Sequence, residues 1–249
     1  MPHRHTILIT GASSGLGAEM ARQFAALGHD LALCARRTAN LDALEAEITA
    51  EHPDRRVEVR PLDVTDDEAV FEVFRAFQQS FGTVDRVVVN AGIGKGAPLG
   101  TGRYDANRAT AVTDFVGALA QLEAAMEIFR AQGAGHLVVV SSMSAMRGMP
   151  RSMNTYAASK AGVAMLAEGL RAELHGTPIR VTVLYPGYIA TEMNEHLSQP
   201  MMVSTGKGVR AMVDAIEKEK ASACVPTLPW EPMKHLLKHA PLPLLRRIV

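Results

Sequence analysis

A glycine-rich turn near the start of the chain constrains the fold more than any other feature. It reads Thr10-Gly11-Ala12-Ser13-Ser14-Gly15-Leu16-Gly17, follows an apolar run and leads into a helical pattern. In such a strand-to-helix turn, the first glycine allows a tight bend, the second lets the backbone approach a pyrophosphate, and the third packs the helix against the strand. The helix start adds amide donors and a positive dipole. We therefore expect a dinucleotide phosphate site formed by Gly11, Ser13, Ser14, Gly15, Leu16 and Gly17.

Short aliphatic runs alternate with helical patterns along almost the whole chain. This alternation is typical of βαβ units that form a parallel sheet. The sequence therefore predicts one Rossmann-type, doubly wound α/β domain over residues 1–249, with helices on both faces of the sheet. The expected strands are residues 6–10, 31–35, 57–62, 86–90, 136–141, 179–185 and 223–226, and the expected helices are residues 16–27, 41–50, 68–81, 108–130, 156–174 and 208–219.

The end of the second expected strand indicates which dinucleotide is preferred. A site for NAD commonly has an acidic residue there, which holds the ribose 2′-hydroxyl. This chain has Ala35 at that point, followed by Arg36 and Arg37. A guanidinium matches a 2′-phosphate in charge and shape, whereas an acidic side chain would repel it. The pattern predicts a preference for NADP(H) over NAD(H), although two arginines also fit a solvated helix entrance.

Two further strand ends are expected at the same edge of the sheet. Asp63 and Val64 end the third strand, and Asn90, Ala91 and Gly92 end the fourth. Ligands of open α/β sheets bind at the carboxyl ends of the strands. We therefore expect these five residues to line the cofactor site.

Three polar residues farther along the chain suggest the chemistry. Ser142 follows the fifth expected strand, and Tyr156 and Lys160 are at positions i and i+4 of the next helical pattern. This spacing brings the phenol and the ammonium to one helix face. The ammonium and a positively charged nicotinamide ring would lower the pKa of the phenol. Tyr156 would then exchange a proton with a substrate oxygen held by Ser142, in position for hydride transfer.

Together these motifs resemble the short-chain dehydrogenase/reductase family, in its ordinary-length branch. The resemblance covers residues 6–193 and implies a seven-stranded parallel sheet. It implies that Ser142 orients the substrate, that Tyr156 is the general acid/base, and that Lys160 binds the nicotinamide ribose and lowers the pKa of the tyrosine. The expected reaction interconverts a secondary alcohol and a ketone, or an aldehyde. The matching residues, in family order, are Thr10–Gly17, Asp63, Asn90-Ala91-Gly92, Ser142, Tyr156, Lys160 and Pro186-Gly187.

The resemblance also assigns cofactor contacts outside the glycine turn. Asp63 and Val64 would contact the adenine, and Asn90 would stabilise the sheet beside the cofactor. After Pro186-Gly187, the resemblance implies that the nicotinamide carboxamide is held by Ile189 and Thr191.

One departure from the family pattern concerns the proton relay. Many members carry a catalytic asparagine on the fourth helix, three residues before a glycine, where a kink holds a water that joins the lysine to solvent. Here Asp114 stands in that place, before Gly117. We expect its charge to pair with Lys160 and to alter the relay. Asn107, earlier in the same helix, is the alternative residue for this role.

Two further departures concern the substrate side. The gap between Ser142 and Tyr156 is one residue longer than usual in the family, so Ser144 remains an alternative to Ser142. The glycine-rich ending of the family is replaced by a basic, leucine-rich extension at about residues 226–249. We expect this extension to cover the substrate cleft or a subunit interface, with peripheral membrane contact as a less favoured alternative.

The expected partners are a small molecule and further copies of the chain. A methionine-containing loop at about residues 190–206 stands where the family has its substrate lid, and it favours a medium-sized apolar alcohol or carbonyl compound. Ordinary core methionines fit the same pattern. The resemblance implies a homodimer or homotetramer, and small residues in the expected helix at 156–174 would permit close packing between subunits.

The composition bounds the environment of the protein. Twenty-six basic residues balance twenty-six acidic ones, so no overall field favours nucleic acid or a membrane surface. Cys34 and Cys224 form no metal-ligand spacing, which predicts buried thiols in a reducing compartment and no metal site. With no secretory or membrane-spanning segment expected, we predict a cytoplasmic protein.

Two functions remain open from the sequence. The first is an active NADP(H)-dependent oxidoreductase, which the complete Ser142, Tyr156 and Lys160 set favours. The second is a cofactor-binding scaffold or redox sensor in which Asp114 has silenced catalysis. Tight NADPH binding without turnover of any carbonyl compound would distinguish the second function from the first.

Overall fold

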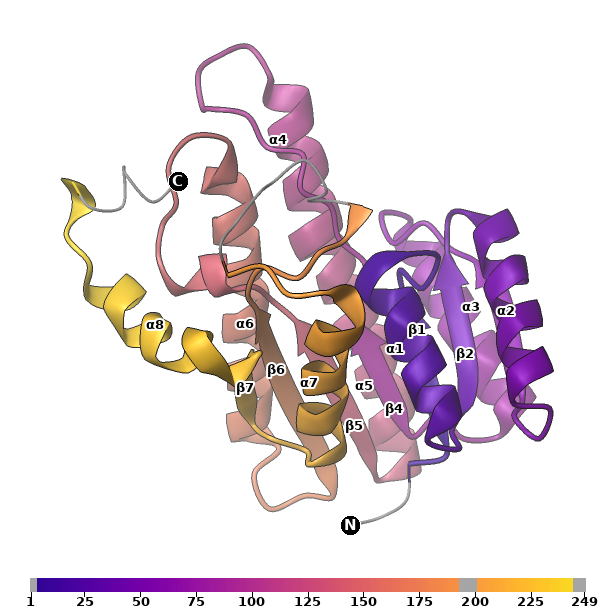
Figure 1. Ribbon diagram of the computed structural model, residues 1–249. Coiled ribbons are helices and arrows are strands. Elements are labelled where there is room, and N and C mark those ends of the chain that lie inside the picture. Colours follow the sequence, from indigo (N-terminus) through magenta and orange to yellow (C-terminus); the bar gives the residue numbers. More distant parts are fainter. Residues whose placement is uncertain (1–3, 193–200, 244–249) are drawn as a thin grey trace.

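The computed structural model describes residues 4–192 and 201–243 (Figure 1). These residues form a seven-stranded sheet in the order β3-β2-β1-β4-β5-β6-β7, and each adjacent pair of strands is parallel. The predicted fold class, a Rossmann-type doubly wound sheet, is confirmed. The strands are β1 (Thr6–Thr10), β2 (Asp30–Ala35), β3 (Val57–Pro61), β4 (Arg86–Val89), β5 (Gly135–Val140), β6 (Ile179–Pro186) and β7 (Ser222–Val225).

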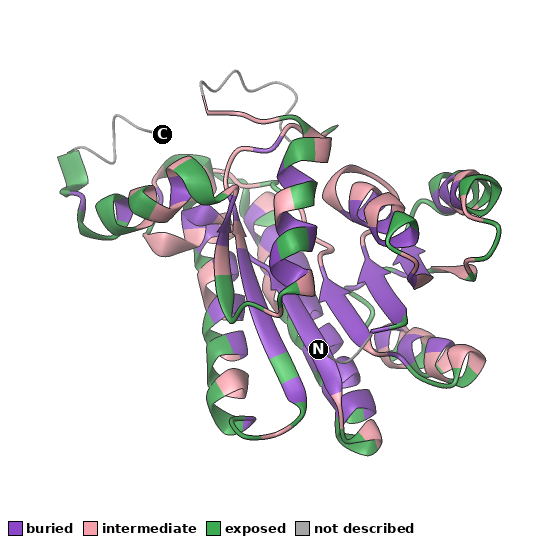
Figure 2. Cartoon of the chain, turned by 60° about the horizontal axis from the view of Figure 1, so that its bottom comes forward, coloured by how far each residue is buried: buried purple, intermediate pink, exposed green. Residues whose placement is uncertain are grey.

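Helices cover both faces of the sheet, which is why the central strands are continuous aliphatic runs. One core packs α3, α5 and α6 against the sheet, and a second packs α1, α2 and α7 against the opposite face. Figure 2 shows the strands buried between helices whose outward faces are exposed. The helices are α1 (Gly15–Ala26), α2 (Thr38–Glu51), α3 (Asp67–Phe81), α4 (Tyr104–Ala111), α5 (Gly117–Gln132), α6 (Asn154–Glu173), α7 (Thr205–Glu217) and α8 (Thr227–His239).

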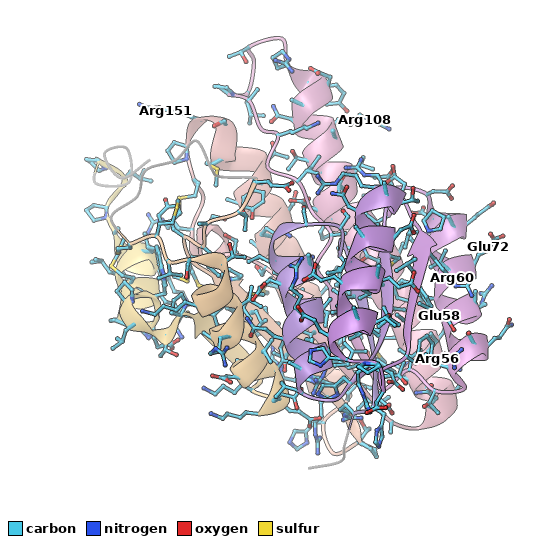
Figure 3. The ribbon with its side chains drawn as sticks, turned by 45° about the vertical axis from the view of Figure 1, so that its right-hand side comes forward. Arg56, Glu58, Arg60, Glu72, Arg108 and Arg151 are labelled. Atoms are coloured by element: carbon cyan, nitrogen blue, oxygen red, sulfur yellow. The ribbon has the colours of Figure 1, made fainter. Side chains whose placement is uncertain are left out.

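Strand β3 forms one edge of the sheet and carries charged side chains there. Glu58 makes ion pairs with Arg56 and Arg60, and Figure 3 labels these three residues. Charged side chains on an edge strand oppose edge-to-edge pairing with another chain. This edge of the sheet is therefore protected from pairing with another chain. The residues of the candidate site lie at the carboxyl ends of the strands.

The structure differs from the sequence prediction in two helical regions. The expected helix at residues 108–130 begins earlier, at Tyr104, and a π-helical turn at Val112–Val116 separates α4 from α5. Helix α8 was not predicted, because Pro229 and Pro232 interrupt its pattern. The chain accommodates them with non-helical backbone at Leu228, near the start of the segment.

Both cysteines are free and buried, as predicted from their spacing. Burial raises the pKa of the Cys34 thiol, and it raises the pKa of the Cys224 thiol to about 12. Thiols in this state are poor nucleophiles. Over residues 4–192 and 201–243, no helix has the length and apolar character needed to cross a membrane.

Candidate active site

The glycine turn between β1 and α1 has a shape that only glycines permit. Gly11 and Gly15 have φ angles of 64° and 55°. A Cβ on Gly17 would lie 2.3 Å from the Gly11 carbonyl oxygen, and one on Gly11 would lie 2.8 Å from the Cα of Ala91. The turn therefore presents bare backbone at the N-terminus of α1. That arrangement fits the pyrophosphate of a dinucleotide.

Hydrogen bonds join this turn to the end of β4. The Thr10 hydroxyl accepts the backbone N–H groups of Asn90 and Ala91 at 3.0 and 3.1 Å. In return, the Asn90 side-chain amide donates to the carbonyls of Thr10 and Gly11 at 2.9 and 3.3 Å. The order of the strands reverses between β1 and β4, where open α/β sheets have their ligand crevice. Asn90 thus fixes the two walls of that crevice.

Arg36 and Arg37 lie at the rim of the crevice, after β2. Arg36 lies 3.8 Å from the Asp63 carboxylate, and both side chains are largely exposed. Arg37 donates to the hydroxyls of Ser13, at 3.3 Å, and Ser14. Two guanidinium groups therefore stand at the rim beside the end of β2, and one of them contacts the glycine turn itself.

Arg37 also forms an ion pair with Glu192, in the segment that follows Pro186-Gly187. Its guanidinium lies 3.0 Å from the carboxylate of Glu192, just beyond Thr191. This ion pair joins the rim of the crevice after β2 to the segment after Gly187, which is expected to hold the nicotinamide. The predicted lid at 190–206 lies partly outside the described residues, at 193–200. Within the described part, Ile189 forms a β-bridge with Val203.

Lys160 and Tyr156 lie on one face of α6, beside the end of β5. Lys160 is buried, and its ammonium donates to the Val140 carbonyl at 3.2 Å and lies 5.9 Å from the centre of the Tyr156 ring. The Ser141 hydroxyl donates to the Lys160 carbonyl at 2.8 Å. These contacts hold the Lys160 ammonium near the Tyr156 ring.

Ser142 and Ser144 are hydrogen-bonded to each other. The Ser142 hydroxyl accepts the Ser144 backbone N–H at 3.2 Å and the Ser144 hydroxyl at 2.9 Å, which starts a 3-10 turn at Met143–Met146. Ser142 lines the cavity that contains Tyr156, and Ser144 is buried behind it. Ser144 therefore orients the Ser142 hydroxyl.

Asp114 lies in the π-helical turn and is fully buried. One carboxylate oxygen accepts the Ile93 backbone N–H at 2.7 Å, and the other has no hydrogen-bond partner among the described residues. Burial raises the pKa of Asp114, and the Lys160 ammonium opposes this rise. Asn107, the alternative relay residue, instead accepts the Ala97 N–H at 3.1 Å and the Thr155 hydroxyl at 3.2 Å. Asn107 therefore holds the loop before α4 against the start of α6.

A single cavity of about 560 Å³ brings nearly all the predicted site residues together. Gly17 and Asp114 are the two exceptions: they lie behind its walls, Gly17 under the glycine turn and Asp114 under Ile93. The predicted residues that line it are Gly11, Ser13, Ser14, Gly15, Leu16, Arg36, Arg37, Asp63, Val64, Asn90, Ala91, Gly92, Ser142, Tyr156, Lys160, Pro186, Gly187, Ile189 and Thr191.

Several lining residues were missed from the sequence. Each of these residues lies next to, or a few positions from, a site residue that was predicted. Their closeness in the sequence to the predicted motifs is the signal that could have identified them. Glu192 stands out, because its charge faces Arg37. The missed lining residues include Ile93, Lys95, Thr113, Val140, Ser141 and Glu192.

Comparison with known proteins identifies the family of this chain. The chain matches the short chain dehydrogenase family over residues 5–201. It is 53% identical to an uncharacterized oxidoreductase of Mycobacterium tuberculosis over 245 residues, 98% of this chain and 97% of that protein.

Two solved structures share the fold. An alcohol dehydrogenase from Thermococcus sibiricus, complexed with 5-hydroxy-NADP, is 25% identical with a TM-score of 0.80 over 90% of this chain and 97% of its own. A short-chain dehydrogenase/reductase from Burkholderia phymatum in complex with NAD is 23% identical with a TM-score of 0.83, over 93% of this chain and 92% of its own. From the family match, the close relative and the geometry of the site, we conclude that this chain belongs to the short-chain dehydrogenase/reductase family of oxidoreductases.

Proposed function

We propose that this oxidoreductase interconverts a secondary alcohol and a ketone, or an aldehyde, with NADP(H) as the hydride carrier. The observation that carries the proposal is the continuous cavity that joins the glycine turn to Ser142, Tyr156 and Lys160. A dinucleotide laid along this cavity would supply or accept the hydride at its nicotinamide end. The glycines that keep the turn open, and the helix N-terminus behind it, fit such a group.

In this proposal the catalytic residues bind the substrate oxygen and move its proton. The Ser142 hydroxyl, oriented by Ser144, donates to that oxygen and fixes its position. Tyr156 gives the oxygen a proton during reduction and removes it during oxidation. Lys160 holds its ammonium beside the Tyr156 ring, where its charge would stabilise the negative charge that develops on the phenol oxygen as the proton leaves. Asp114, behind Gly92, acts on this lysine through its charge.

The proposed preference for NADP(H) rests on charge at the rim of the cavity. Arg36 and Arg37 follow β2 directly, and their guanidinium groups attract a 2′-phosphate. Asp63 and Glu192 pair with them and would have to share these cations with the phosphate. Because Arg37 also donates to Ser13 and Ser14, it remains on the glycine turn whichever acceptor it meets.

We further propose a cytoplasmic homodimer or homotetramer that acts on an apolar substrate. Exposed apolar side chains on α5 and α6, Leu119 and Met165, support a subunit contact through these helices. The apolar substrate is supported by the buried methionines that follow Ser142 in the chain, Met143 and Met149.

The experiment that tests the proposal follows NADPH absorbance with a panel of ketones, aldehydes and alcohols. We expect oxidation of NADPH with at least one carbonyl compound, or the reverse reaction with an alcohol. Tight NADPH binding without turnover of any panel member would contradict the proposed reaction and favour the silenced scaffold.

A further inference from the structure

A third apolar cluster lies apart from the two cores of the sheet, at the catalytic end of the molecule. We call it the methionine cluster. It packs α8 against β7 and the segment after β5, and Figure 1 shows α8 beside β7. Its buried members are Met143, Met149, Ala157, Cys224, Trp230, Leu237 and Ala240, and its partly buried members are Met146, Met153, Tyr185, Tyr188, Met201 and Met233.

The methionine cluster begins where the catalytic cavity ends. Three of its members directly follow cavity residues in the chain: Met143 follows Ser142, Ala157 follows Tyr156, and Tyr188 follows Gly187. The cavity and the methionine cluster are therefore adjacent at Ser142, at Tyr156 and at Gly187. In the proposed reaction, the rest of a substrate whose oxygen lies between Ser142 and Tyr156 would extend toward these side chains.

Trp230 packs directly against Gly187, which lines the cavity. A Cβ on Gly187 would lie 2.0 Å from the indole ring, so the absence of a side chain at Gly187 makes room for the tryptophan. The ring meets the Tyr188 ring edge-on, with centroids 5.5 Å apart. Trp230 is buried, yet its indole N–H has no acceptor within residues 4–192 and 201–243. Buried donors in a plain packing position normally have a partner.

We propose that Trp230 is the specificity-determining residue of the substrate site, and that the site selects carbonyl compounds bearing an aromatic group next to the carbonyl. The inference deepens the proposed function and rests on it. An indole wall and thioethers make favourable contacts with an aromatic ring. Thioether side chains also adjust to the ring because they are unbranched. A small aliphatic ketone gains little from either contact.

The first test compares Trp230→Ala with the wild type on acetophenone and on 2-butanone. We expect kcat/KM for acetophenone to fall by about tenfold or more and that for 2-butanone by less than about threefold. The Kd for NADPH should change by less than about threefold, since Trp230 supplies no atom to the cavity lining and reaches the cavity wall only through Gly187. Equal losses for both ketones, or a loss that follows NADPH affinity, would overturn the proposal.

Two variants separate selectivity from folding. Trp230→Phe keeps an aromatic wall and should retain most of the preference for acetophenone. Met212→Ala removes a fully buried side chain on the opposite face of the sheet and should lower stability without changing the ratio of the two ketones. If Met212→Ala changes the ratio of kcat/KM for the two ketones as much as Trp230→Ala does, the ratio reflects a general loss of packing. The proposal would then fail.

A binding measurement makes the outcome independent of turnover. Trp230 is the only tryptophan of the chain, so its fluorescence reports on this position alone. With saturating NADP⁺, acetophenone should quench the emission saturably and 2-butanone should leave it almost unchanged. Saturable quenching in a protein that reduces no ketone would contradict the proposed reaction and support the aromatic site. Turnover of acetophenone without saturable quenching would support the reaction and overturn the role of Trp230.

Discussion

Asp114 and Lys160, from two different elements, both face the open side of Gly92. A Cβ on Gly92 would lie 3.2 Å from an Asp114 carboxylate oxygen and 3.1 Å from the Lys160 ammonium nitrogen. A side chain at Gly92 would therefore push apart the buried acid and the lysine beside Tyr156. Their closeness gives Asp114 an influence on the proton that reaches the substrate, although Asp114 does not line the cavity.

The first prediction concerns turnover in Asp114→Asn. When it is ionised, the buried Asp114 carboxylate attracts a proton that passes near Lys160, and this attraction slows delivery of the proton to Tyr156. We expect the asparagine variant to fold and to turn over faster by about threefold or more where proton transfer limits the rate. A pH–rate profile of both forms measures this. Equal or lower turnover of the variant at every pH would show that Asp114 is no impairment.

The second prediction concerns stability in the same variant. Burial raises the pKa of Asp114, so the folded protein holds this proton more tightly than the unfolded chain does. The stabilisation that results from this raised pKa is complete at pH values below the ordinary aspartate pKa. It is lost as the pH rises through the pKa that Asp114 has in the folded protein. Asp114→Asn should therefore gain stability relative to the wild type, on the order of 1 kcal/mol, at about pH 8 and less at about pH 5. Urea unfolding at both pH values measures the difference, and an equal gain at both would contradict it.

The third prediction concerns cofactor choice. Arg37 contacts Ser13 and Ser14 on the glycine turn, so it lies where a 2′-phosphate would approach. Wild-type protein should bind NADPH at least about tenfold more tightly than NADH, about 1.4 kcal/mol. Arg36→Asp should invert this order, because repulsion replaces attraction to the phosphate while the ribose hydroxyls gain an acceptor. Titration calorimetry with both cofactors decides, and similar affinities in the wild type would refute the preference.

The fourth prediction concerns a buried histidine at the opposite end of the sheet. His136 accepts a hydrogen bond from Arg86 at 2.9 Å, and its other ring nitrogen meets the Thr182 hydroxyl at 2.8 Å. Burial and the Arg86 charge hold the pKa of His136 well below its ordinary value. The unfolded chain therefore takes up the proton first, and stability is lost as pH falls below about 6.5.

The matched variant for this histidine is His136→Gln, which keeps a polar side chain but cannot take up a proton. The loss of stability between about pH 7.5 and about pH 5.5 should be smaller in this variant than in the wild type. Urea unfolding at the two pH values measures it. An identical loss in both proteins would place the pH dependence in other groups.

The strands and the glycine turn could be predicted because local patterns determine them. Residues 6–17 combine an apolar run, three glycines and a helical pattern, and each part is favoured by its own sequence. Tyr156 and Lys160 were predictable for a similar reason, because helical spacing alone brings them to one face.

The rest depends on contacts between distant segments. The π-helical turn at Asp114 and the contact between Trp230 and Gly187 arise from packing, which no local pattern specifies. Helix α8 was missed because its prolines lower helical propensity, and packing of Trp230 and Leu237 overrides that propensity. The partner of Arg37, Glu192, lies far away in the sequence and was missed for the same reason.

The central claim is that Tyr156 exchanges the substrate proton in a cavity that also binds the cofactor. The most direct test measures kcat and NADPH affinity in Tyr156→Phe, which removes one hydroxyl from the cavity lining. We expect kcat to fall by about a hundredfold or more while the Kd for NADPH stays within about threefold of the wild type. A variant that keeps most of the wild-type kcat would contradict the account.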